Sequence, residues 1–188
     1  MTYSPFNGEL ELSDGRRVFV NRATQEHGQG IKRFFETLSP ESWNCFQAHP
    51  FTDEVIARRM ERSENFDDLV YVALAGNTVA AYFFLWIINN PVPLLGIGIA
   101  DAWQNCKMGQ KLMAILIDDA KKLDKVGIEL TTRLDNERAF HVYQKLGFQY
   151  YGDVRNEVAS GEIVIERGMF LPLKEGIVRP DTKHECPE

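Results

Sequence analysis

The residues best placed to do chemistry form a short polar run, residues 103–110, which reads Trp-Gln-Asn-Cys-Lys-Met-Gly-Gln. An apolar segment, residues 94–100, precedes this run and is typical of a strand, and Met108, Leu112 and Ile115 then recur at helical spacing. The expected order is therefore strand, tight loop and helix. Such a loop presents free backbone N–H groups at the positive end of the helix dipole, an arrangement that suits an anionic phosphate.

Two glycines, Gly96 and Gly98, interrupt the apolar strand. Glycine weakens a strand, and it is found more often at a bulge or where a ligand approaches the backbone. One interpretation is a core strand with an incidental bulge, and the other is a backbone that receives a ligand. Because the loop follows at a suitable distance, the sequence favours the second interpretation.

A second stretch, residues 136–148, reads Asn-Glu-Arg-Ala-Phe-His-Val-Tyr-Gln-Lys-Leu-Gly-Phe. Together the two stretches resemble the GNAT superfamily of acetyl-CoA-dependent N-acetyltransferases. In that family the pyrophosphate loop reads Gln/Arg-x-x-Gly-x-Gly/Ala, and a later helix reads Asn-x-x-Ala-x-x-x-Tyr-x-x-Leu-Gly-Phe. The second motif matches in full. The first matches at Gln104 and Gly109 but has Lys107 where the first glycine is usual.

The resemblance covers residues 17–173 and implies acetyl-CoA as co-substrate, with no metal. In relatives, backbone groups of the strand hold the pantetheine arm, one N–H points at the thioester carbonyl, and the loop cradles the pyrophosphate. The cofactor-binding residues that the resemblance implies are Ile97, Gly98, Ile99, Gln104, Asn105, Cys106, Lys107, Met108, Gly109, Gln110, Asn136 and Tyr143.

Lys107 is the departure from the family pattern. A glycine at this place permits positive φ and a close phosphate, whereas a lysine loses both but offers an ammonium that could contact the phosphates. The loop is therefore either a working site with altered geometry or a weakened one, and the intact Gly109 favours the first. Cys106 lies near the helix N-terminus, but no His/Asp pattern surrounds it, so we do not expect it to act as a nucleophile.

Acetyl transfer to an amine makes three demands. The amine must lose a proton, since a lysine-like ammonium has a pKa of about 10.4; the oxyanion needs a donor; and the departing thiolate needs a proton. The resemblance makes Tyr143 the candidate general acid, although its spacing from Ala139 and Leu146 also fits a core aromatic. Asp101 and Glu129 are the candidate bases, and neither is singled out by the sequence.

The acceptor side is expected over the helical stretch of residues 25–60, as the resemblance implies. Trp43 and Phe46 in that stretch, with Tyr82 from a strand, are therefore candidate substrate-binding residues. Core packing is the favoured explanation of these aromatics. The acceptor is a small-molecule or protein amine, and the negative net charge is compatible with a cationic one such as a polyamine or an aminoglycoside.

The elements that position these residues follow from periodicity. Strands are expected at residues 17–22, 69–74, 78–88, 94–100, 128–134, 148–154 and 163–173, with a loose lead or an extra edge strand before residue 12. The fold class is α/β (α+β), a GNAT-like mixed and mostly antiparallel central sheet of about six to seven strands with helices on both faces. Lys125 and Gly127 are expected to end the central helix. One domain over residues 1–174 and a flexible tail over residues 175–188 are expected.

Composition narrows the function classes. The net charge of −6 disfavours a nucleic-acid partner, and three widely spaced cysteines argue against a disulfide framework and a zinc site. No leader or membrane-spanning run is visible, so we expect a cytoplasmic protein with no membrane partner, either monomer or homodimer. The predicted function is transfer of an acetyl group from acetyl-CoA to a primary amine by direct attack in a ternary complex. The alternative is a non-catalytic acyl-CoA-binding or regulatory protein with the same fold.

Overall fold

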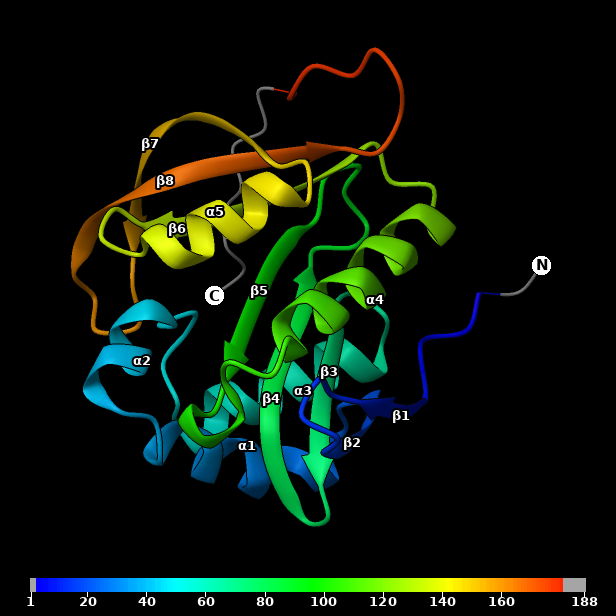
Figure 1. Cartoon of the computed structure of the whole chain (residues 1–188), viewed down its shortest axis with the longest axis vertical. Helices are drawn as coiled ribbons and strands as arrows, with labels where there is room; N and C mark the ends of the chain where they lie inside the picture. Colours follow the sequence, from blue (N-terminus) through cyan, green and yellow to red (C-terminus); the bar gives the residue numbers. More distant parts are fainter. Residues whose placement is uncertain (1–2, 181–188) are drawn as a thin grey trace.

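The computed structural model describes residues 3–180, which form one eight-stranded sheet with helices on both faces (Figure 1). The strands are β1 (Gly8–Glu11), β2 (Arg17–Arg22), β3 (Leu69–Ala75), β4 (Thr78–Trp86), β5 (Leu94–Ile99), β6 (Gly127–Arg133), β7 (Gln149–Glu157) and β8 (Ile163–Pro172). The helices are α1 (Gly28–Glu36), α2 (Pro40–Cys45), α3 (Asp53–Glu64), α4 (Met108–Lys122) and α5 (Glu137–Lys145), with short 3-10 turns at η1 (Gln25–His27) and η2 (Asp101–Trp103).

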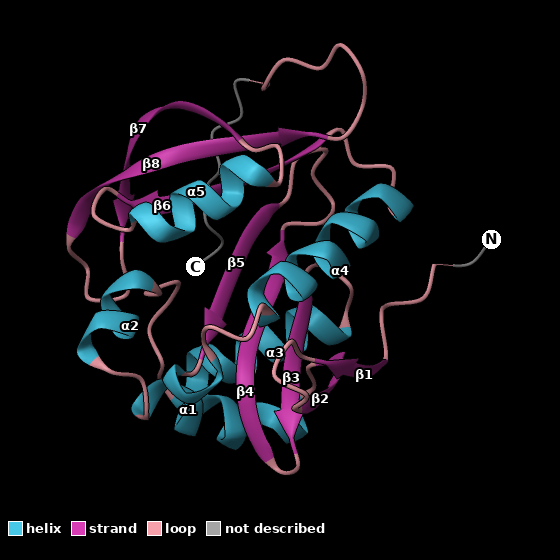
Figure 2. Cartoon of the chain, viewed as in Figure 1, coloured by secondary structure: helices cyan, strands magenta, loops and turns pink. Residues whose placement is uncertain are grey.

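The sheet runs in the order β1-β2-β3-β4-β5-β6-β8-β7, and every neighbouring pair is antiparallel except β5 and β6. The predicted fold class is confirmed, with one strand more than expected because residues 8–11 pair with β2 as an edge strand. The parallel pair β5–β6 has a single register pair, Leu94 with Glu129. Figure 2 shows that β6, β7 and β8 then turn away from the direction of β5.

Two hydrophobic cores lie on opposite faces of the sheet. On one face, α4 packs against β4, β5 and β6 through residues such as Leu112 and Leu116, and α5 adds the partly buried Phe140 and Tyr143 to the same core. On the other face, α1 and α3 pack through Phe35 and Met60. Strand β4 is buried along nearly its whole length because helices cover both of its faces, which explains its continuous apolar sequence.

Local sequence signals fix most helix boundaries. The Ser39 hydroxyl accepts from Ser42 N–H at 3.2 Å and caps α2, with Pro40 at the first helical position. The expected end of the central helix is wrong. Helix α4 ends at Lys122, and Gly127 starts β6 instead, where a Cβ would lie 2.3 Å from the ring of Phe170. Close strand packing, not helix termination, is therefore the reason for this glycine.

Part of the predicted tail packs onto the sheet. Arg179 donates to Glu129 at 2.9 Å and lies 4.0 Å over the ring of Tyr151. Residues 181–188 lie outside the described residues. No helix within residues 3–180 has the length and apolar character to cross a bilayer.

Candidate functional site

The divergence of β5 from β6 opens a cavity of about 800 Å³ between the two strands. Six parts of the chain line it: the end of β5, the loop before α4, the first turn of α4, α5, β6, and α2 across the opening. Because β5 has no β6 partner beyond Leu94, the backbone edge that a continuing parallel strand would cover faces this cavity.

The loop before α4 brings free amides to the cavity. Asn105 and Lys107 both adopt left-handed backbone conformations, with φ of 63° and 60°. No side chain caps the first turn of α4, and Met108, Gly109 and Gln110 line the cavity there. An uncapped N-terminus of a 15-residue helix carries unsatisfied N–H groups and the positive end of the dipole.

Lys107 differs from expectation in one respect. The sequence reasoning held that a lysine would lose the positive φ that a glycine allows, and that inference is wrong, because Lys107 has φ 60° and ψ 14°. An L-residue pays about 1–2 kcal/mol for this conformation. The turn thus keeps the geometry that a glycine would give, at the expense of local strain, and the exposed ammonium remains available at the loop.

Cys106 is the member of the loop that turns inward. Its side chain is buried, and the thiol donates to Trp103 C=O at 2.9 Å. The β1–β2 hairpin supports the same loop from behind: Ser13 N–H donates to Cys106 C=O at 3.2 Å, and the Arg16 guanidinium lies 4.2 Å over the ring of Trp103. Arg16 also donates to Ala102 C=O at 2.8 Å. The loop is therefore held by a part of the chain that the sequence motifs do not include.

Gln104 and Asp101 tie the loop to α2. Gln104 Nε2 donates to Ser42 Oγ at 2.9 Å and to Ile99 C=O at 3.3 Å. The Asp101 carboxylate accepts from Ser39 N–H and Ser39 Oγ, each at 2.8 Å, and from Ser42 Oγ. These hydrogen bonds lower the pKa of Asp101, and the one from Ser42 has the largest effect. The Asp101 carboxylate is therefore a weak base.

Glu129, the other candidate base, lies away from the cavity. It is 3% exposed and is absent from the residues that line the opening. Its carboxylate accepts from the Tyr151 hydroxyl and pairs with Arg179. Both candidate bases are thus engaged with other partners.

The two strand glycines are explained by aromatic rings. A Cβ on Gly96 would lie 2.2 Å from the ring of Phe84, and a Cβ on Gly98 would lie 2.3 Å from the ring of Phe46. Ile97, Gly98 and Ile99 line the cavity. The lack of a side chain at Gly98 therefore makes room for the ring of Phe46, which belongs to the protein itself.

Tyr143 and Asn136 meet the cavity from the motif helix. Asn136 Oδ1 accepts from Ala139 N–H at 3.1 Å and so caps α5. Tyr143 lines the cavity, and its ring lies 5.8 Å from that of Phe148, centre to centre. Burial, followed by the charges of Cys45 and Glu166, raises the pKa of Tyr143 to about 12. Its hydroxyl therefore keeps its proton at neutral pH.

Of the three predicted substrate aromatics, Phe46 lines the cavity and the other two lie behind it. Tyr82 is fully buried, and Trp43 packs edge-on against Phe35 and Phe51. His49 joins this cluster, 3.2 Å from the Tyr82 hydroxyl, and burial lowers its pKa to about 4. Packing between α1, α2 and β4 therefore accounts for most of this aromatic group.

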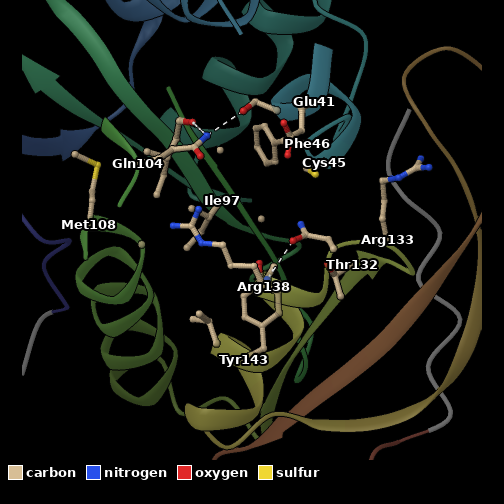
Figure 3. Close-up of a pocket in the computed structure, with 18 of the residues that line it drawn as sticks. Glu41, Cys45, Phe46, Ile97, Gln104, Met108, Thr132, Arg133, Arg138 and Tyr143 are labelled. Atoms are coloured by element: carbon tan, nitrogen blue, oxygen red, sulfur yellow. Dashed lines mark hydrogen bonds between the residues drawn. The ribbon is translucent and has the colours of Figure 1, made fainter. Parts of the chain in front are cut away.

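The sequence reasoning missed Arg138. Figure 3 shows its side chain extending from α5 into the cavity, toward the start of α4. The sequence did contain a signal for it: Arg138 is a basic residue two positions after the cap Asn136, in the first turn of a helix that begins at the cavity.

Within the described part of the chain, no group of three or more His, Cys, Asp or Glu residues could hold a metal ion.

The sequence model of the acetyltransferase (GNAT) family matches residues 32–148. No curated protein sequence matches the chain. The GNAT domain of S. lividans PAT has a TM-score of 0.73 at 17% identity, covering 89% of this chain and 97% of that one. Salmonella typhimurium yncA, solved with acetyl-CoA as its cofactor, has a TM-score of 0.68 at 15% identity, covering 88% and 99%. Vibrio fischeri ribosomal-protein-S5-alanine acetyltransferase has a TM-score of 0.69 at 15% identity, covering 84% and 94%. These structural likenesses show the fold.

Proposed function

The chain belongs to the acetyltransferase (GNAT) family, and on that premise we propose that it transfers an acetyl group from acetyl-CoA to a primary amine within a ternary complex. The observation that carries the proposal is the uncapped start of α4, which opens onto the cavity between the parted strands. Free amides at one end and an open strand edge along the wall match an anionic diphosphate with an extended amide-containing arm.

The diphosphate lies, in this proposal, against the amides of residues 108–110. Lys107 and Arg138 supply cations beside it, from the loop and from α5 respectively. Gln104 and Asn105 shape the loop, while Cys106 contributes backbone only because its thiol points inward. The pantetheine arm runs along residues 97–99 and pairs with the free edge of β5, with Asn136 at its other side.

Acetyl-CoA supplies an activated acyl group as a thioester. A backbone N–H of residues 97–99 stabilises the oxyanion that forms when the amine attacks. Tyr143, which keeps its proton at neutral pH, donates that proton to the departing sulfur. The amine attacks directly, so no covalent enzyme intermediate is needed, which agrees with the buried position of Cys106.

The test is a thiol-release assay with acetyl-CoA and a panel of amines: spermidine, kanamycin and a peptide with a free N-terminus. Calorimetry with CoA is run in parallel. We expect saturable CoA binding and release of thiol that depends on an amine. An absence of heat with CoA would overturn the cofactor assignment.

A second function is a protein of the same fold that binds acyl-CoA without turnover. The observation in its favour is that Asp101 and Glu129 are both engaged with other partners. CoA binding without thiol release for any amine would support this alternative.

We place the catalytic unit in residues 1–174 and its activity in the cytoplasm, as monomer or homodimer, with no nucleic-acid or membrane partner. The acidic total charge is compatible with a cationic acceptor.

A further inference from the structure

The ring of Phe46 closes one side of the cavity against the backbone of β5. A Cβ on Gly98 would lie 2.3 Å from this ring, so the ring packs directly on the strand where the glycine has no side chain. Phe46 is the C-cap residue of α2, and Figure 3 shows its ring at the cavity. Packing this close leaves no room for another group between the ring and the strand.

Behind Phe46 lies a close-packed group of aromatic rings. The ring of Phe35 is stacked on that of Phe46, with centroids 6.0 Å apart and planes 13° apart. The rings of Tyr82 and Phe84 each lie 6.2 Å from it, centre to centre. All three of these neighbours are at most 2% exposed. The Phe46 ring therefore cannot move back from the cavity without displacing a packed neighbour.

The backbone that carries Phe46 is attached on both sides. At the start of α2, the Asp101 carboxylate accepts from Ser39 N–H and Ser39 Oγ, each at 2.8 Å. Just after α2, Gln47 C=O accepts from Ala159 N–H of the β7–β8 loop at 3.4 Å. Phe46 lies between these attachments, at the end of a helix of only 6 residues. Its ring is thus held against β5 by the backbone as well as by its neighbours.

The proposed course of the cofactor leads toward this ring. The diphosphate lies at the start of α4, and the thioester carbonyl meets a backbone N–H of residues 97–99. Helix α4 packs in the core on one face of the sheet, whereas Phe46 packs against the core on the other face. An extended cofactor therefore passes between β5 and β6 and carries its acyl group toward the face on which Phe46 lies.

We propose that the Phe46 ring limits the length of the acyl chain, so that the site takes acetyl-CoA and excludes CoA thioesters of longer straight-chain acids. The inference rests on the proposed function, from which it takes the place of the thioester, and it adds the class of donor. An acetyl group ends in one methyl. Each further methylene must displace the ring or draw the carbonyl away from its N–H donor, and one methylene in an apolar pocket changes selectivity by about 10–200-fold.

The experiment compares Phe46→Ala and Phe46→Leu with Phe51→Ala in the full chain. Phe51 is the matched control, because its ring also stacks on Phe35 but is not among the described residues that line the cavity. Calorimetry without an amine gives the Kd of CoA, acetyl-CoA, propionyl-CoA and butyryl-CoA. Thiol release with two donors and one amine gives their ratio of kcat/KM, in which any effect of Phe46 on the amine cancels. Thermal unfolding of each variant checks its fold.

We expect the wild type to bind butyryl-CoA about 10–100-fold more weakly than acetyl-CoA, with propionyl-CoA between them. Phe46→Ala should bind acetyl-CoA and butyryl-CoA within about threefold of each other, because the space of the ring becomes available to the chain. Phe46→Leu should fall between these results, and it carries the test if the alanine variant does not fold. Phe51→Ala should keep the wild-type ratio, and CoA itself should bind equally to all variants because it has no acyl group.

Equal affinity of the wild type for acetyl-CoA and butyryl-CoA would overturn the inference, and so would an unchanged ratio in the folded Phe46 variants. An equal loss of discrimination in Phe51→Ala would also overturn it, because the cause would then be a general loosening of the aromatic rings. Discrimination between the donors without acetylation of any amine would overturn the proposed transfer and leave the role of Phe46 standing. A chain that binds no CoA species would overturn both.

Discussion

Replacing Lys107 by glycine should change stability and cofactor affinity in opposite directions. Glycine relieves about 1–2 kcal/mol of left-handed strain, and its greater freedom in the unfolded chain offsets about 0.5–1 kcal/mol of that gain. The net gain is about 0.5–1 kcal/mol. For a chain of this length it corresponds to a rise in Tm of about 1–4 °C.

The same change removes the ammonium from the loop. A hydrogen bond to a charged group contributes about 1.5–3 kcal/mol, and the exposure of Lys107 reduces this to about 1 kcal/mol through screening. We therefore expect the Kd for CoA to rise about fivefold at low salt, and less at high salt. Calorimetry with CoA and thermal unfolding of the same preparations give both quantities.

Lys107→Ala separates the two effects. Alanine removes the ammonium but keeps the strained left-handed backbone, so we expect weaker CoA binding without a gain in Tm. Tighter CoA binding by Lys107→Gly than by the wild type would refute the reasoning, because it would mean that the ammonium gives no net help to the phosphates and that the loop is a weakened site.

Three further changes test other parts of the site. Tyr143→Phe should lower kcat about 10²-fold without changing acetyl-CoA affinity. Burial raises the pKa of Tyr143 to about 12. The rate of the wild-type enzyme should therefore not fall near the ordinary tyrosine pKa of about 10 through loss of this proton. Arg16→Ala removes the cation over Trp103, so KM for acetyl-CoA should rise severalfold with kcat nearly unchanged, as steady-state kinetics would report. Gly98→Ala should reduce the free energy of unfolding in urea by about 1–3 kcal/mol, because its Cβ would lie 2.3 Å from an aromatic ring. Gly109→Ala is its control, since a Cβ there would lie 3.4 Å from the nearest side-chain atom.

Arg17→Ala removes a guanidinium that pairs with Glu9 and Glu11 on the hairpin surface, so acetyl-CoA kinetics should not change. An equal rise of KM in both arginine variants would assign the effect to charge and not to support of the loop. If Tyr143→Phe retained full kcat, the proton for the departing sulfur would have to come from water.

Elements whose signal is local could be predicted from the sequence. The strand, loop and helix around Gln104, and the capped helix that begins after Asn136, were found because each motif lies within a dozen residues and has its own periodicity. The cap of α2 by Ser39 is another case. These features depend on neighbours along the chain, so their spacing is visible without the fold.

Features that depend on distant segments could not be predicted in this way. The ring against Gly98 comes from Phe46, and the support of the loop comes from Arg16. Hydrogen bonds among Thr131, Asn156 and Glu166 likewise join three different strands. The left-handed conformation of Lys107 is a further case. Residue preference argues against it, and the surrounding contacts impose it.

The parting of the sheet connects these observations. A parallel pair that continued beyond Leu94 would satisfy the β5 backbone with β6 and would close the cavity. Because the strands diverge, the loop before α4 and the α5 helix line one end of the cavity, whereas α2 lines the other. Lys107, Arg138 and the first amides of α4 gather at the first end. In the proposed reaction, a donor with several negative charges therefore enters from the first end, and the amine meets it beside Tyr143 from the other.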